Sequence, residues 1–302
     1  MNNELRRIAN TLILYSYHVI SSGLFSGKTG ILLYLYRYAQ YADCKYCRNF
    51  ADGLLDEVLA SVSHTPFDFE NGLTGIGWSV NYLLQEGLIS GDPNEILEDL
   101  DNKVFSFQNI DFRSSIFGQG IYLLERLKEN EKNAKFENYV TTCLDVYFRE
   151  MNGYKGFVSL YHINSLLFFL TEVERQKKNC GSINSIIKIL PSILEKIFYE
   201  RAYDEADLYL YNRIREDIYT KQDDKWKDVI SLNPTTKVTD LNIETKIKIL
   251  WFEKLYLKDK QTPPLSLDEI SKFINEKQEN IILDNLLFFR GLSGLGNVII
   301  QI

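Results

Sequence analysis

The sequence predicts an all-α protein built from repeated helix pairs. Apolar residues recur at helical spacing along most of the 302 residues, whereas the alternation typical of strands never persists beyond a few positions. Glycines cluster at intervals that match the length of a helix pair in a repeat protein. These observations favour one all-α domain over residues 1–302, with about six or seven helical hairpins.

The glycines give the clearest sign of a repeat. Thirteen of the 17 glycines fall into five clusters, and each cluster opens a strongly apolar run. The last glycines of the first four clusters are separated by 47, 43 and 36 residues, and a further 140 residues separate Gly156 from Gly296. A gap of that length has room for about three more helix pairs. The clusters are Gly23/Gly27/Gly30, Gly72/Gly75/Gly77, Gly118/Gly120, Gly153/Gly156 and Gly291/Gly294/Gly296.

The two helices of each pair differ in character. The first follows the glycines and is apolar nearly all round, as in "GILLYLYRYA" and "GWSVNYLLQE", which is typical of a helix buried on every side. The second is amphipathic. In residues 49–62 one apolar face is predicted to comprise Phe50, Leu54, Leu55, Val58, Leu59 and Val62.

Capping residues place the starts of several amphipathic helices. The chain opens with a helix whose apolar face holds Ile8 and Leu12. Asp92 is expected to cap a helix that begins at Pro93, and Ser266 or Asp268 a helix that follows the prolines at 263–264. Residues 200–240 are polar and irregular, which favours a helix followed by a surface connection.

Composition excludes several classes of function. A formal charge of −7 argues against nucleic acid or an anionic membrane surface as the main partner. No apolar stretch is long enough for a membrane span, and the N-terminal run is interrupted by polar residues and lacks a signal-peptide cleavage site. The four cysteines do not form a disulfide framework in a chain of this length, so we expect a reduced, cytoplasmic setting. Cys44 and Cys47 have C-x-x-C spacing but no surrounding βαβ pattern.

We expect the glycines to be structural. "GLFSGKTG" is one residue short of a phosphate-binding loop and follows no strand. Glycines at helix starts allow sharp turns and close helix approach; the residues assigned this role are Gly27, Gly30, Gly75, Gly77, Gly118, Gly120, Gly294 and Gly296. If these helix starts converge, they surround a mouth that favours anionic groups, with Lys28, Thr29, Asn71 and Trp78 as candidate binding residues.

The motifs "GLFSGKTGILLYLY", "NGLTGIGWSVNYLL" and "FFRGLSGLGNVIIQI" resemble the glycine-rich repeats of the lanthionine synthetase C-like family. The resemblance is clear over residues 22–170 and 288–302, and weak over 174–287. It implies an α/α toroid, in which an outer ring of helices encloses an inner ring with glycine-rich starts. It also implies a bacterial role in modifying ribosomally made peptides, with a precursor peptide and its modifying enzymes as partners.

The family's chemistry requires a zinc ion that activates a cysteine thiolate. Its zinc ligands are a cysteine late in the chain and a Cys-His pair further on, but this sequence has no cysteine after Cys180 and no histidine after His162. None of the family's zinc ligands therefore has a counterpart in this sequence. A substitute site from Cys44, Cys47 and His64 would lie away from the mouth, so we expect no metal and no other cofactor. The chain would then be a peptide-binding or accessory component without zinc-dependent cyclase activity.

Two alternatives remain open. Helical toroids also host glycosidases, which need two carboxylates at the mouth. Asp68, Glu70 and Asp111 precede glycine clusters and are the candidates for such catalysis, with His162 as a further candidate that we interpret instead as a hydrogen-bonded core residue. The second alternative is an interaction scaffold with no peptide-processing role, which a mouth filled by side chains would favour.

Overall fold

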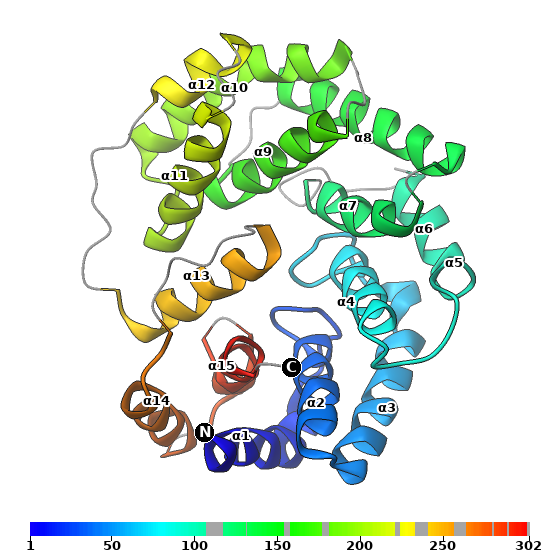
Figure 1. Cartoon of the computed structure of the whole chain (residues 1–302), viewed down its shortest axis with the longest axis vertical. Coiled ribbons are helices and arrows are strands. Elements are labelled where there is room, and N and C mark those ends of the chain that lie inside the picture. Colours follow the sequence, from blue (N-terminus) through cyan, green and yellow to red (C-terminus); the bar gives the residue numbers. More distant parts are fainter. Residues whose placement is uncertain are drawn as a thin grey trace. The chain divides into compact units, whose positions relative to one another are not determined.

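The protein is all-helical over the part that the computed structural model describes, namely residues 1–106, 117–130, 132–153, 158–176, 181–220, 224–232, 241–256, 264–279, 281–288 and 290–300. These residues form fifteen α-helices and four short 3-10 helices, with no strand among them (Figure 1). The all-α prediction is therefore confirmed. Within the same residues, no helix is long and apolar enough to cross a membrane.

Contacts divide the chain into two compact units, with one boundary within α6 (Glu98–Phe105) and the other between residues 240 and 241. Unit 1 joins residues 1–101 to residues 241–302, and unit 2 comprises residues 102–240. The other helices of unit 1 are α1 (Asn2–Tyr15), α2 (Lys28–Ala42), α3 (Lys45–Ala60), α4 (Leu73–Gln85), α5 (Pro93–Ile96), α13 (Ile243–Tyr256), α14 (Leu267–Glu279) and α15 (Leu292–Ile299). Those of unit 2 are α7 (Gly118–Asn130), α8 (Ala134–Gly153), α9 (Leu160–Arg175), α10 (Gly181–Glu200), α11 (Glu205–Thr220) and α12 (Lys227–Ser231).

Unit 1 contains the predicted alternation of buried and amphipathic helices. All residues of α2 from Thr29 to Ala39 are buried, and α4 is buried from Leu73 to Asn81. By contrast, α3 buries a single stripe of Cys47, Ala51, Leu54 and Val58. Leu54 and Val58 of the predicted face are buried as expected, whereas Leu59 is 42% exposed and the buried stripe continues through Cys47 and Ala51 instead.

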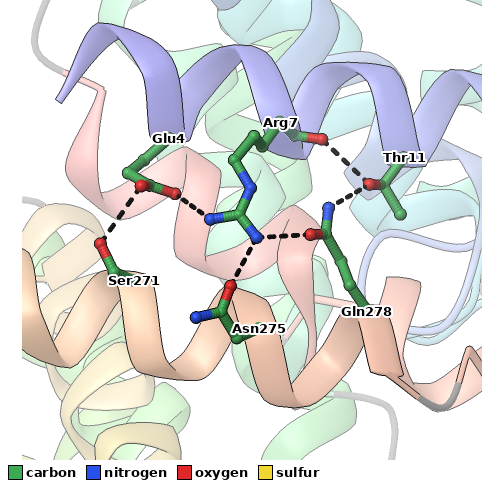
Figure 2. A network of polar contacts seen from close by, with 6 residues as sticks. All are labelled: Glu4, Arg7, Thr11, Ser271, Asn275 and Gln278. Carbon is green, nitrogen blue, oxygen red and sulfur yellow. Dashed lines mark hydrogen bonds and ion pairs between the residues drawn. The ribbon is translucent and has the colours of Figure 1, made fainter.

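Two segments far apart in sequence pack side by side in unit 1. Helix α1 lies against α14, and their polar side chains contact in the same order along both helices (Figure 2). Arg7 donates to Asn275 Oδ1 at 2.6 Å and to Gln278 Oε1 at 2.7 Å, while Gln278 donates to Thr11 Oγ1 at 2.6 Å. Glu4 pairs with Arg7 and accepts from Ser271, so the two helices run parallel and end on the same side.

A buried arginine joins α2 to the end of α15. Arg37 donates through Nη2 to the carbonyl oxygen of Ile300 at 2.6 Å and through Nη1 to that of Asn297. Asn297 in turn donates to the carbonyl oxygens of Gly30 and Ser293. Because the last carbonyls of a helix have no partner within it, a cation at this place stabilises the helix end. Burial lowers the pKa of Arg37 from its usual value.

In unit 2, α7 packs on α8 and α9 through a glycine. The backbone N–H of Gly120 donates to Tyr147 Oη at 2.8 Å, and a Cβ at this position would lie 2.7 Å from Cγ of Phe169. Such a contact leaves no room for a side chain. Further along the unit, Pro191 lies inside α10.

Two predicted helix starts are confirmed, and one is corrected. Asp92 caps Pro93–Ile96 by accepting from the N–H of Asn94, and Ser266 accepts from the N–H of Glu269 at the start of α14. The fourth glycine cluster does not open a helix as expected. Gly153 ends α8, Gly156 lies outside the described residues, and α9 begins after Ser159, which caps it.

Candidate functional site

Three segments of unit 1 share one backbone conformation where they enter a helix. We call the segments leading into Gly27, Gly72 and Gly291 the first, second and third glycine turns. Each of these glycines is the N-cap of its helix (α2, α4 and α15), with φ/ψ of −148/−170°, −122/−169° and −142/−169°. The repeat read from the sequence therefore corresponds to a repeated structure at these three places.

The close contacts of the three glycines are also equivalent. A Cβ at each would collide with the carbonyl oxygen six residues earlier and with the backbone nitrogen four residues earlier. Since backbone atoms cannot move aside as a flexible side chain can, only glycine fits. The carbonyls belong to Ser21, Pro66 and Asn285, and the nitrogens to Gly23, Asp68 and Leu287.

Within each of the first two turns, the helix-start donors are used internally. The N–H of Lys28 donates to Ser21 O at 2.9 Å, and that of Leu73 donates to Pro66 O at 2.7 Å. The hydroxyls of Thr29 and Thr74 donate to carbonyls seven residues earlier. These donors point back into their own turns and are already paired there.

Backbone hydrogen bonds join the three turns in the order third, first, second. Phe288 N donates to Phe25 O at 3.0 Å, and Phe25 N donates to Glu70 O at 2.7 Å. A side-chain contact between Ser26 and Asn71 adds a second link between the first and second turns. The turns thus lie next to one another, although the third is more than 200 residues from the others in sequence.

Behind the turns, five buried aromatic rings close a circle. Phe25, Phe69 and Phe288 come from the turns themselves, Trp78 from α4 and Trp251 from α13. Neighbouring centroids are 4.5 to 6.1 Å apart, and most pairs meet edge to face, an arrangement worth about 0.5–1.5 kcal/mol per pair beyond area burial. The indole N–H of Trp251, fully buried, has no acceptor among the described residues.

No family model, curated protein or solved structure matches the chain.

The four candidate binding residues occupy different surroundings. Asn71 is exposed on the second turn, and Lys28 forms an ion pair with Glu57 of α3. Thr29 is buried, with its hydroxyl bonded to the carbonyl of Ser22 at 2.5 Å. Trp78 is 5% exposed and belongs to the aromatic circle. Of the four, Asn71 is the most accessible to a ligand.

The candidate acids and base have structural partners. Asp68 accepts from the N–H of Asn71 at 2.6 Å, and the backbone of Glu70 accepts from Phe25. Asp111 lies outside the described residues. His162 Nδ1 is 2.8 Å from Ser159 Oγ and accepts from the N–H of Ser159 at the start of α9. Burial lowers the pKa of His162 to about 4, so its imidazole is neutral at pH 7.

The described residues hold no group of three His, Cys, Asp or Glu side chains placed to bind a metal ion. Cys44 and Cys47 lie together at the start of α3, while the side chain of His64, the third residue considered for a substitute site, is outside the described part.

Sequence reasoning missed two features of the site. One is the partnership of Trp78 with Trp251, which no local pattern signals because α4 and α13 are far apart in sequence. The other is an equivalent surface position just before each N-cap glycine, filled by Ser26, Asn71 and Arg290. Asn71 and Arg290 are exposed and Ser26 is partly exposed. Aligning the three motifs by Gly27, Gly72 and Gly291 would have revealed this polar rim.

Proposed function

We propose that the chain is a peptide-binding accessory protein in the modification of ribosomally made peptides. It would be a member of the lanthionine synthetase C-like family, with that family's α/α toroid, that has lost the zinc site. One observation carries the proposal: three glycine turns of the same conformation, whose motifs resemble that family's repeats, lie next to one another in unit 1. The missing Cys and Cys-His ligands argue against zinc-dependent cyclisation.

The polar rim is the proposed peptide contact. Ser26, Asn71 and Arg290 bring a hydroxyl, an amide and a guanidinium to one surface, and such groups hydrogen-bond to the backbone or the carboxylates of an extended peptide. Apolar side chains are exposed nearby in sequence, just after the parallel helices α1 and α14 end. They are Tyr17 (71%), Ile20 (92%), Ile282 (59%) and Leu283 (47%). Exposed groups of both kinds would suit a partly apolar linear peptide.

The test is fluorescence anisotropy with labelled linear peptides of lanthipeptide-precursor type, rich in Cys, Ser and Thr. Asn71→Ala should weaken binding about tenfold, which corresponds to about 1.4 kcal/mol. Ser26→Ala removes the contact between the turns and one of the three rim groups but keeps the Asn71 amide, so it should weaken binding less than Asn71→Ala does. Asn49→Ala, at an exposed position on α3 outside the rim, is the control that should bind as the native chain does.

Two results would contradict the proposal. One is that no peptide of this type binds. The other is that a dehydrated precursor peptide loses free thiols when incubated with the protein and zinc, because that loss reports thioether formation rather than an accessory role.

The aromatic circle favours a second candidate, an interaction scaffold without any role in peptide processing. Rings from three turns and two helices fill the space behind the rim. In this case the partner would be a folded protein held by the exposed apolar side chains. Ile20→Ser would then abolish partner binding, whereas Asn71→Ala would leave it unchanged. Sugar hydrolysis by Asp68, Glu70 and Asp111 is a further alternative.

A further inference from the structure

Two cysteines meet at the first turn of α3. Cys44 is the N-cap residue, with an extended backbone (φ −97°, ψ 91°), and its Sγ accepts from the N–H of Cys47 at 3.3 Å. Burial, together with the neighbouring Cys44 side chain, raises the pKa of Cys47 to about 12. Cys44 is partly exposed and Cys47 is buried.

We propose that Cys44 and Cys47 form a redox-active dithiol that exchanges with small disulfides of the glutathione type. The argument is independent of the proposed function, because it rests on these two thiols alone. The Cys44 sulfur already lies 3.3 Å from the backbone nitrogen of Cys47, so the two cysteines share one helical turn, and oxidation would join their sulfurs in a disulfide of about 2.05 Å. The difference in exposure gives each cysteine a separate role.

Cys44, the accessible thiol, reacts first. Its thiolate attacks one sulfur of the external disulfide, which forms a mixed disulfide on Cys44 and releases one thiol that takes up the proton from Cys44. The Cys47 sulfur then attacks Sγ of Cys44, closes the internal disulfide and releases the second thiol with the proton from Cys47. Two electrons pass from the protein to the external disulfide, which is reduced to two thiols.

Cys143 provides the contrast within the same chain. It is fully buried in α8, and burial raises its pKa, so an external disulfide cannot reach it in the folded protein. The structure describes no second thiol beside it. Exchange in the folded protein should therefore be confined to the Cys44–Cys47 pair among the described cysteines.

The first test is peptide mapping of the native chain after incubation with oxidised glutathione and alkylation of free thiols. Trypsin cleaves after Lys45, which separates the two cysteines into the peptides 38–45 and 46–48. We expect these peptides to be joined by a disulfide, with a mass loss of about 2 Da, and to separate when reduced glutathione is added in excess. Because it uses the native chain, this result does not depend on the folding of any variant.

Variants separate the two roles. Cys47→Ser should stop at the mixed disulfide and gain about 305 Da, whereas Cys44→Ser should gain nothing at position 47. Cys143→Ser should form the joined peptides as the native chain does. The proposal is overturned if peptides 38–45 and 46–48 stay unlinked, or if glutathione remains attached to Cys44 in the native chain.

Discussion

Replacing Gly75 by alanine tests whether the glycine turns are held by close packing. Gly75 lies in the first turn of α4, and a Cβ there would collide with the carbonyl oxygen of Phe69, while approaching Phe69 C at 3.0 Å and Leu24 Cβ at 3.1 Å. The second turn would have to move away from α4. That movement strains the hydrogen bond of 2.7 Å between Phe25 and Glu70, which joins the second turn to the first.

The expected loss of stability in Gly75→Ala is the balance of one favourable and two unfavourable contributions. Alanine gains about 1 kcal/mol over glycine in a helix. Against this, overpacking costs about 1–3 kcal/mol, and weakening the hydrogen bond between the turns costs about 1 kcal/mol more. Because the clash is with backbone, we take the upper part of that range and expect a net loss of about 2–3 kcal/mol. The melting temperature should then fall by about 4–12 °C.

Gly53→Ala is the matched control. Gly53 lies inside α3, also in unit 1, and a Cβ there meets nothing within 4 Å. The same substitution should therefore stabilise the protein by about 1 kcal/mol. Tryptophan fluorescence suits both measurements, since Trp78 and Trp251 lie in unit 1 and Trp226 in unit 2. If Gly75→Ala and Gly53→Ala have free energies of unfolding within 0.5 kcal/mol of each other (about the scatter expected of surface changes), the reasoning is wrong.

Three other substitutions test separate parts of the structure. Arg37→Met should lower the free energy of unfolding, measured by chemical denaturation, by about 2–4 kcal/mol, because it leaves the buried carbonyls at the end of α15 without a donor. A loss below about 0.5 kcal/mol would contradict this. Arg201→Gly should raise the free energy of unfolding by about 1 kcal/mol, since Arg201 has a left-handed backbone with φ of 53°. Unchanged stability would show that the backbone is not strained there. In the folded protein the pKa of His162 is lowered from about 6.5 to about 4. Between these two pH values the unfolded chain therefore binds more protons than the folded protein does. The free energy of unfolding should fall as the pH falls, by at most about 1.4 kcal/mol per pH unit. His162→Gln keeps an acceptor for the N–H of Ser159 and should flatten that slope in unfolding curves measured across this pH range; an unchanged slope would show that another group causes it.

Much of unit 1 could be predicted from sequence because its glycines have a local cause. Where the chain enters a helix against its own backbone, as at Gly27, Gly72 and Gly291, a Cβ cannot fit, and the requirement appears as a motif. The prediction failed at α9 because Ser159 caps that helix through its side chain, so no glycine is needed.

The candidate site was less predictable because its contacts join distant segments. Nothing near Trp78 in sequence indicates that Trp251 packs on it, and nothing near Arg7 indicates that Asn275 and Gln278 accept its hydrogen bonds. The candidate acids were chosen for their place before a glycine cluster. That place instead gives Asp68 a role in the turn, as the acceptor for the N–H of Asn71.

The anchoring of α15 by Arg37 has a consequence for synthesis on the ribosome. The two partners, Arg37 and Asn297, are 260 residues apart, so at about 5–20 residues per second the arginine emerges about 13–50 s before its acceptor. During that interval α2 lacks the neighbour that covers it, and its long apolar surface is open to chaperones or to other nascent chains. Unit 2 is continuous in sequence and has no such delay. We therefore expect unit 2 to fold first, and unit 1 to complete its folding only after α15 has been synthesised.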